Sequence, residues 1–313
     1  MLKKNFQIIS RYDNLPLHGF ILEPDGQKKG VVQLVHGMCE YKERYLPFAK
    51  YLCTYGYVVA CYDQRGHGES VAAQEDLGWF KDFTGEAFVE DAVQVTEYLK
   101  SKYPDVSLTL FGHSMGSMIV RCYAAKYDDK IDKLIVCGSP SKNPLASVGV
   151  LLAKLLGKIK GERYRSKLLS NLSTGRHDKK FKGEGAGAWL SRNRKCTEEF
   201  YSNSKGKCRF TCNGFENLFK LMKKTYQKKR YEVKNPTMPI YFISGDCDAV
   251  AGSTMAWLQS VDFMVEVGYE NVTCKPYKGL RHEILNELGR KQVYEDVLAF
   301  LNGELVSEET EEE

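Results

Sequence analysis

The sequence lacks a long hydrophobic run. Among its 313 residues, no stretch approaches the roughly 20 consecutive apolar residues that a membrane-spanning helix needs. The most apolar candidate, residues 148–156, is too short and is interrupted by Lys154. The first 20 residues contain two lysines, but no apolar run or small-residue cleavage site follows them. We therefore expect neither a secretory signal nor a membrane span, and we predict a cytoplasmic location.

The sequence also has little that is typical of a metal site. Its ten cysteines are scattered, and most lie within apolar runs, as Cys61, Cys122 and Cys137 do. Such cysteines are typical of reduced thiols that pack as small hydrophobic side chains. Cys208 and Cys212 form a C-x3-C pair, but no His-x3-His accompanies it. We therefore expect no metal and no organic cofactor.

Charge is distributed unevenly along the chain. The net charge is +5, yet residues 139–235 contain 24 Lys and Arg against 7 Asp and Glu. No helix-turn-helix, zinc-finger or RNA-binding signature accompanies this basic segment, so we do not expect nucleic-acid binding. The overall composition, 43% hydrophobic and 27% charged, is typical of a globular domain.

Short apolar runs alternate with amphipathic segments on both sides of the basic region. The apolar runs predict buried strands at residues 30–37, 55–63, 107–114, 133–140, 239–246 and 271–277. Helical patterns occur at residues 86–102, 115–127, 253–267 and 284–301. This alternation is typical of an α/β fold in which helices cover both faces of a mostly parallel sheet.

Residues 139–235 break the alternation. They contain helical patterns at residues 145–160 and 213–227 and no convincing strand. We therefore predict a helical cap inserted into the sheet domain, followed at the end of the chain by an acidic, disordered tail. The predicted divisions are a core in two parts (1–138 and 236–303), the cap (139–235) and the tail (304–313).

The first cap helix allows two interpretations. Residues 145–160 are apolar on one face, and Lys154, Lys158 and Lys160 lie at or near the other. The simpler interpretation, which we favour, is a lid helix whose apolar face packs on the core. The alternative is an amphipathic surface that contacts lipid aggregates.

The sharpest motif is GHSMG at residues 112–116. It follows an apolar run and precedes a helical pattern, which is the context of a nucleophile elbow. The flanking glycines would allow a tight, strained turn that exposes the Ser114 hydroxyl. A glycine-rich turn with a helix-starting serine is the alternative, but the acid and the base that follow in the chain favour a nucleophile.

A serine nucleophile needs a base and an orienting acid, which in this fold follow it along the chain. His282, the last histidine of the sequence, follows the predicted strand 271–277. Two acids, Asp246 and Asp248, follow the strand 239–246. Asp246 could cap the next turn, whereas Asp248 lies deeper in the loop and can reach the histidine. This reasoning favours Asp248 and leaves Asp246 open.

The oxyanion of an acyl-transfer intermediate needs two hydrogen-bond donors. We expect them to be the backbone N–H groups of Met115, directly after the nucleophile, and of Met38, in the loop after the strand 30–37. His36 would hold that loop by hydrogen bonds and take no part in the chemistry.

Five ordered motifs together resemble the monoacylglycerol lipase and lysophospholipase branch of the α/β hydrolases, also labelled serine aminopeptidase S33-like. They are HGMCEYKERY at 36–45, YDQRGHGES at 62–70, GHSMGS at 112–117, GDCDAV at 245–250 and GLRHEIL at 279–285. The resemblance extends over about residues 15–300. It implies Asp248 as the acid, His282 as the base, Met38 and Met115 as oxyanion donors, and a helical cap over the pocket.

The resemblance also assigns the YDQRGHGES residues a supporting role. It implies that Asp63, Arg65 and His67 form a loop scaffold beside the site. One departure is Ser117, where glycine is commoner in the family; a small residue there should still permit close helix packing.

These features predict a serine hydrolase for carboxylic esters of single-acyl lipids, either monoacylglycerols or lysophospholipids. Small soluble or aryl esters are the alternative substrates, and a non-catalytic ligand-binding protein is a third interpretation. The scarcity of acids in the cap argues against an aminopeptidase, which must hold a substrate ammonium. Basic residues of the cap could attract anionic headgroups at a membrane or micelle surface, at about 1 kcal/mol each.

Overall fold

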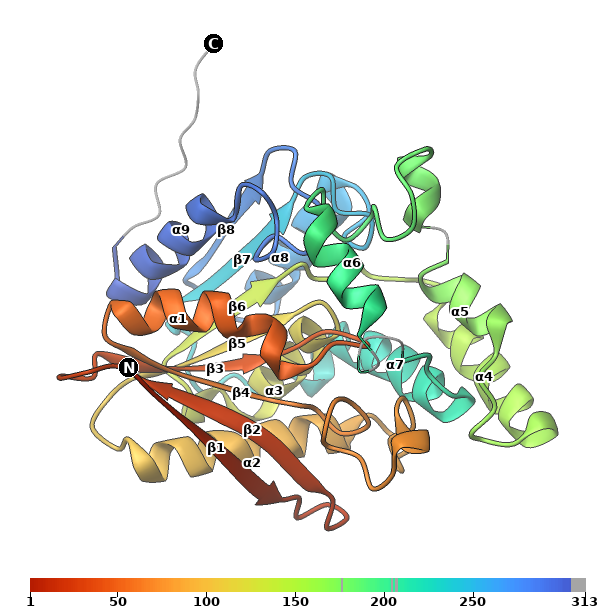
Figure 1. The fold of residues 1–313 in the computed structure, drawn as a ribbon, viewed down its shortest axis with the longest axis horizontal. Helices are drawn as coiled ribbons and strands as arrows, with labels where there is room; N and C mark the ends of the chain where they lie inside the picture. Colours follow the sequence, from red (N-terminus) through yellow and green to blue (C-terminus); the bar gives the residue numbers. More distant parts are fainter. Residues whose placement is uncertain (176, 204, 206–207, 305–313) are drawn as a thin grey trace.

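The computed structural model describes residues 1–175, 177–203, 205 and 208–304, which form one eight-stranded sheet in the order β1-β2-β4-β3-β5-β6-β7-β8 (Figure 1). The strands are β1 Leu2–Ile9, β2 Pro16–Glu23, β3 Gly30–Val35, β4 Tyr57–Tyr62, β5 Leu108–His113, β6 Lys133–Cys137, β7 Ile240–Gly245 and β8 Val272–Tyr277. β2 pairs antiparallel with β1 and β4, and the remaining pairs are parallel. The carboxyl ends of the parallel strands therefore lie along one side of the sheet, and the candidate active site lies there.

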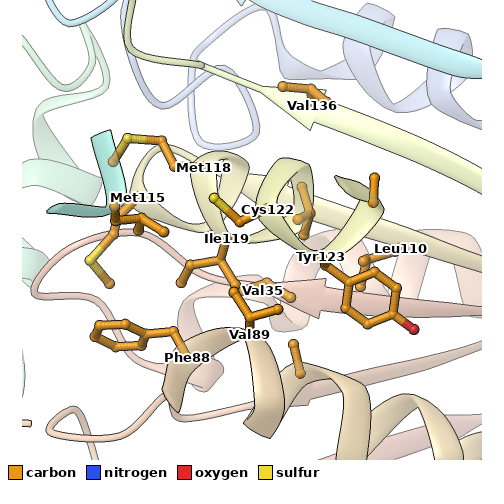
Figure 2. Packing of buried hydrophobic residues seen from close by; sticks show 14 of the residues in the cluster. Val35, Phe88, Val89, Leu110, Met115, Met118, Ile119, Cys122, Tyr123 and Val136 are labelled. Carbon is orange, nitrogen blue, oxygen red and sulfur yellow. The ribbon is translucent and has the colours of Figure 1, made fainter. Parts of the chain in front are cut away.

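Helices cover both faces of the sheet. The α-helices of the described residues are α1 Leu46–Thr54, α2 Glu86–Lys102, α3 Met115–Tyr127, α4 Ala146–Lys160, α5 Lys167–Ser173, α6 Arg194–Ser202, α7 Cys212–Thr225, α8 Thr254–Glu266 and α9 Arg290–Asn302. α1 and α9 pack on one face, in a core cluster that includes Phe111 of β5. α2, α3 and α8 pack on the other, where Leu110 of the same strand lies among α3 side chains (Figure 2). Because neighbouring residues of β5 point to opposite faces of the sheet and helices cover both faces, the strand is buried along its whole length.

The structure confirms the predicted α/β-hydrolase fold and the predicted strands to within a few residues. Helices α1, α5 and α6 were not predicted, and two further parts of the fold differ. The N-terminal hairpin β1–β2 was not predicted, because in β1 only Phe6 and Ile8 are buried. The last helix begins at Arg290 instead of residue 284. Ile284 and Leu285 are buried in the turns that follow His282, so they extend the apolar pattern without being helical.

In the sequence, helices α4, α5 and α6 come between β6 and α7. In space, they lie on the side of the molecule away from α9 (Figure 1). β6 and β7 are parallel neighbours, so the chain must cross over between them. α7 serves this crossover and packs against both α3 and α4. The cap boundaries at residues 139 and 235 stay a prediction, and residues 305–313 of the predicted tail lie outside the described residues.

α4 packs on the core cluster through one face, as the favoured interpretation expects, but large apolar side chains also lie on its outer face. Its buried residues are Ala146, Gly149 and Ala153. A Cβ on Gly149 would lie 2.8 Å from the ring of Phe219 in α7, so the two helices pack closely through small side chains. Val150, Leu152 and Leu156 are partly buried against the core cluster, whereas Leu151, Leu155 and Ile159 face outward.

None of the helices in the described part of the chain is long and apolar enough to cross a bilayer.

Candidate active site

Ser114 lies in a strained turn between β5 and α3. Its backbone angles are φ 54° and ψ −117°, a conformation that residues with a side chain rarely adopt. The Ser114 N–H donates to the carbonyl of Cys137 (2.9 Å), and the Ser117 hydroxyl donates to the carbonyl of Ser114 (2.5 Å). These hydrogen bonds hold Ser114 at the carboxyl end of β5, and the Ser117 hydroxyl stabilises the turn.

The two glycines of the motif permit close approach of the backbone, not an unusual backbone angle. Neither Gly112 nor Gly116 has a positive φ; the strain lies in Ser114 itself. A Cβ on Gly112 would lie 2.4 Å from the carbonyl oxygen of Gly116, and one on Gly116 would lie 2.0 Å from that of Val35. The glycines therefore allow the tight turn, as expected, by leaving room for neighbouring backbone, and the strained angle is that of Ser114.

The structure brings three of the predicted residues together. His282 Nε2 lies 2.8 Å from Ser114 Oγ, and His282 Nδ1 lies 2.9 Å from Asp248 Oδ2. Asp246, the acid left open by the sequence, is exposed and accepts the N–H of Gly279 (2.7 Å). The geometry therefore selects Asp248 as the histidine's partner.

Asp248 is fully buried, yet its surroundings favour the ionised carboxylate. Burial opposes ionisation, but His282 and the N–H groups of Val250 (2.7 Å) and Ala251 (3.3 Å) outweigh it and lower the pKa of Asp248. An ionised carboxylate only accepts hydrogen bonds, so Nδ1 of His282 carries the proton. Nε2 is then free to accept the proton of the Ser114 hydroxyl.

The loop after β3 lies against the serine. A Cβ on Gly37 would lie 3.0 Å from Ser114 Cβ, so this loop could not carry a side chain there without shifting. Met38, the next residue, and Met115 line the same cavity as Ser114. Two N–H donors can converge on one oxyanion only if this loop lies close to Ser114, as it does. The role of the Met38 and Met115 N–H groups as an oxyanion hole stays a prediction.

A buried ion network, not singled out in the sequence, connects the loops on either side of the triad. Arg44 donates to Glu40 in the β3 loop (2.5 Å) and to Glu283, next to the base (2.6 and 2.8 Å). Burial would raise the pKa of Glu40, but Arg44 and His113 hold it well below its usual value. Both Glu40 and Arg44 belong to the HGMCEYKERY motif, so this motif was the sequence feature that could have indicated the ion network.

The predicted scaffold residues lie outside the site. Asp63 pairs with Lys42 (2.7 Å), and Arg65 pairs with Asp91 (2.7 Å). Burial lowers the pKa of His67 to about 3, so its imidazole is neutral at ordinary pH. The structure describes Asp63, Arg65 and His67, and none of them lines the cavity next to Ser114.

A cavity of about 600 Å³ opens above Ser114, within the size range of small-molecule sites. Its apolar wall includes Met118 of α3 and Leu218 and Met222 of α7. Trp189 stacks on the imidazole of His282, with 5.4 Å between ring centroids. The cavity therefore offers an apolar compartment directly beside the triad.

Among the described residues, no group of three or more His, Cys, Asp or Glu side chains is placed to hold a metal ion.

The sheet topology, the strained serine turn and the Ser–His–Asp hydrogen-bond series define the α/β-hydrolase class. Within this class, the family model described as serine aminopeptidase, S33, matches residues 26–289. The chain belongs to this family and is a hydrolase.

Known proteins similar to this chain include lipases and an esterase. A monoacylglycerol lipase of Mycolicibacterium smegmatis is 28% identical over 89% of this chain and 90% of its own length. The monoglyceride lipase of Mus musculus is 28% identical over 85% of this chain and 79% of its own length. The crystal structure of a thermostable carboxyl esterase from Bacillus coagulans, in complex with glycerol, aligns with a TM-score of 0.88 and 27% identity. It covers 97% of this chain and 99% of the esterase.

Proposed function

We propose that this chain is a serine carboxylic-ester hydrolase that cleaves single-acyl lipids. The observation that carries the proposal is the hydrogen-bonded series Ser114–His282–Asp248 at the floor of a cavity with an apolar wall. Relatives named as monoacylglycerol lipase, monoglyceride lipase and carboxyl esterase support ester hydrolysis.

The proposed reaction has two halves. His282 removes the Ser114 proton as Ser114 Oγ attacks the ester carbonyl, and the N–H groups of Met38 and Met115 stabilise the oxyanion. The intermediate collapses, the C–O bond to the alcohol breaks, and His282 donates its proton to the departing alcohol. Water then attacks the acyl-enzyme with His282 again as base, which releases the fatty acid and restores Ser114. Asp248 stabilises the imidazolium in both halves.

The wall of the cavity argues for an ester over a peptide substrate. An aminopeptidase needs a carboxylate to hold the substrate ammonium. Glu40 and Glu283 line the cavity, but both are already paired with Arg44. The apolar side chains Met118, Leu218 and Met222 suit an acyl chain.

The proposal is tested by measuring hydrolysis of a panel: p-nitrophenyl esters of graded length, 1-monoacylglycerol, lysophosphatidylcholine and an aminoacyl anilide. We expect a preference for acyl chains of at least medium length and no turnover of the anilide. A maximum at two to four carbons, with inhibition by micelles, would instead identify an esterase for small soluble substrates. Absence of any ester turnover by folded protein would reject the proposed function.

We further propose that the cap contacts a membrane or micelle through the outer face of α4. Three large side chains on this face, Leu151 (68%), Leu155 (51%) and Ile159 (66%), are largely exposed. Leu168 and Leu172 of α5 are also exposed. Lys158 and Lys160, in the last turn of α4, supply positive charge beside the apolar stripe. An exposed apolar stripe flanked by lysines is the pattern of helices that lie in a lipid interface.

Replacing Leu151 and Leu155 together by serine should weaken binding to vesicles of phosphatidylserine and phosphatidylcholine. Each leucine contributes up to about 1.5–3 kcal/mol when buried, so the double variant should lose tenfold or more in affinity. Cosedimentation with the vesicles measures the effect. Met255→Ser provides a matched control, since this α8 side chain is equally exposed (68%) but lies outside the cap. Equal partitioning of the double variant and wild type would contradict the docking surface.

A further inference from the structure

Two cysteines from different parts of the chain meet at the edge of the active-site cavity. Cys39 directly follows Met38 in the loop after β3, and Cys208 lies in the cap between α6 and α7. The Cys39 thiol donates a hydrogen bond to the carbonyl oxygen of Cys208 (2.8 Å). Both are free thiols, and both line the cavity above Ser114.

The backbone at Cys39 is unusual for a residue with a side chain. Its φ is 58°, in the left-handed region, where glycine would cost less free energy. The loop therefore holds a thiol at a position whose backbone favours glycine. The thiol is buried and points to the cap.

Cys208 is held against the core by its neighbours. The N–H and the hydroxyl of Thr211 both donate to the carbonyl of Gly78 (3.0 Å each). A Cβ on Gly78 would lie 3.0 Å from Cys208 Sγ, so the sulfur packs directly on this glycine. The position of Cys208 relative to the β3 loop is thus fixed by the hydrogen bonds of Thr211 and by the packing of the sulfur on Gly78.

The two thiols differ in accessibility. The Cys208 side chain, together with burial, raises the pKa of the Cys39 thiol well above its usual value, so Cys39 stays protonated. Cys208 is only half-buried. An oxidant in the cavity would therefore reach Cys208 first.

We propose that Cys39 and Cys208 form a reversible disulfide that connects the β3 loop covalently to the cap under oxidation by a peroxide. The Cys208 sulfur attacks the peroxide, the O–O bond breaks, and a sulfenic acid and one water are produced. The Cys39 sulfur then attacks the sulfenic acid sulfur and its proton passes to the departing oxygen, so that the S–O bond breaks and a second water leaves. The two thiols lose two electrons and two protons, and hydrogen peroxide is reduced to two waters.

The disulfide would restrict the roof of the cavity. Phe200 and Tyr201 of α6 line the cavity and lie only a few residues before Cys208. A covalent bond to the β3 loop keeps this side of the roof from lifting. A bulky lipid requires a wider entrance than a small ester does, so oxidation should affect lipid turnover more strongly.

The test is oxidation of the full chain with hydrogen peroxide, followed by digestion without reductant and mass spectrometry. We expect a peptide that joins Cys39 to Cys208. Hydrolysis of long-chain monoacylglycerol in micelles should fall about tenfold or more and that of p-nitrophenyl acetate by less than about threefold, as expected when access through a lid becomes limiting. Dithiothreitol should restore both activities.

Two variants separate this disulfide from general oxidative damage. Each is compared with its own untreated activity. Cys208→Ser should lose no more than a small fraction of its activity after peroxide treatment. Cys196→Ser, which removes a half-buried cap thiol outside the cavity, should respond like wild type.

The proposal fails if oxidised wild type contains no peptide joining Cys39 to Cys208, or if the joined protein hydrolyses the lipid undiminished. It goes beyond the proposed function. If untreated wild type hydrolyses no ester, the proposed function is rejected, while peptide mapping still decides whether the disulfide forms.

Discussion

Ser114→Ala is expected to lower kcat for ester hydrolysis by about a million-fold, since removing a triad serine leaves only the residual catalysis of the oxyanion donors and binding. The hydroxyl is the group that His282 Nε2 faces at 2.8 Å, and alanine removes the nucleophile without adding volume. Steady-state kinetics with a p-nitrophenyl ester that wild type accepts measures the loss.

Labelling by a fluorophosphonate gives a second readout for the same variant. Wild type should be labelled at Ser114, and Ser114→Ala should not be labelled. Ser101→Ala, at an exposed position in the last turns of α2, is the matched control and should be labelled like wild type. Persistent labelling or unchanged turnover in Ser114→Ala would show that another nucleophile does the chemistry.

The second large effect is expected for Asp248→Asn, with a loss in kcat of about ten-thousand-fold. In wild type the ionised carboxylate accepts the proton of His282 Nδ1 at 2.9 Å. The amide of asparagine would instead donate to Nδ1 and favour the tautomer with the proton on Nε2. That proton faces Ser114, so the imidazole could no longer accept from the hydroxyl.

Asp246→Asn is the matched control for this substitution, two residues earlier in the same loop. Asp246 is exposed, and its bond to the Gly279 N–H lies outside the triad. We expect kcat of the control to stay within about threefold of wild type, the size of effect typical for a surface change of a few tenths of a kcal/mol. A larger loss from Asp246→Asn than from Asp248→Asn would reverse the assignment of the acid.

The strands that the sequence predicted best are those that are buried on both faces of the sheet. β3, β4, β5 and β7 are buried at every residue, so each is a short, mostly apolar run with a turn at its end. Since parallel strands end at one edge, the motifs after β5, β7 and β8 had to converge. This explains why the convergence of Ser114, Asp248 and His282 could be predicted.

Periodicity could not predict which face of a helix is buried. In α4 the pattern correctly gave a helix, but its large apolar side chains are divided between two faces. Leu152 and Leu156 pack toward the core, whereas Leu151, Leu155 and Ile159 are exposed. The ion network of Arg44 was missed for a different reason. Glu283 is distant in sequence from Glu40 and Arg44, and nothing in the local pattern links the three.

The strain at Ser114 sets catalysis against stability. A residue with a side chain in such a conformation costs on the order of 1–3 kcal/mol, a sizeable share of the 5–15 kcal/mol that stabilises a typical domain. Ser114→Gly would relieve that strain, so we expect a higher melting temperature together with the loss of the nucleophile. A selection for heat resistance alone would therefore enrich inactive molecules at this position, and directed evolution of this chain must screen for turnover in every round.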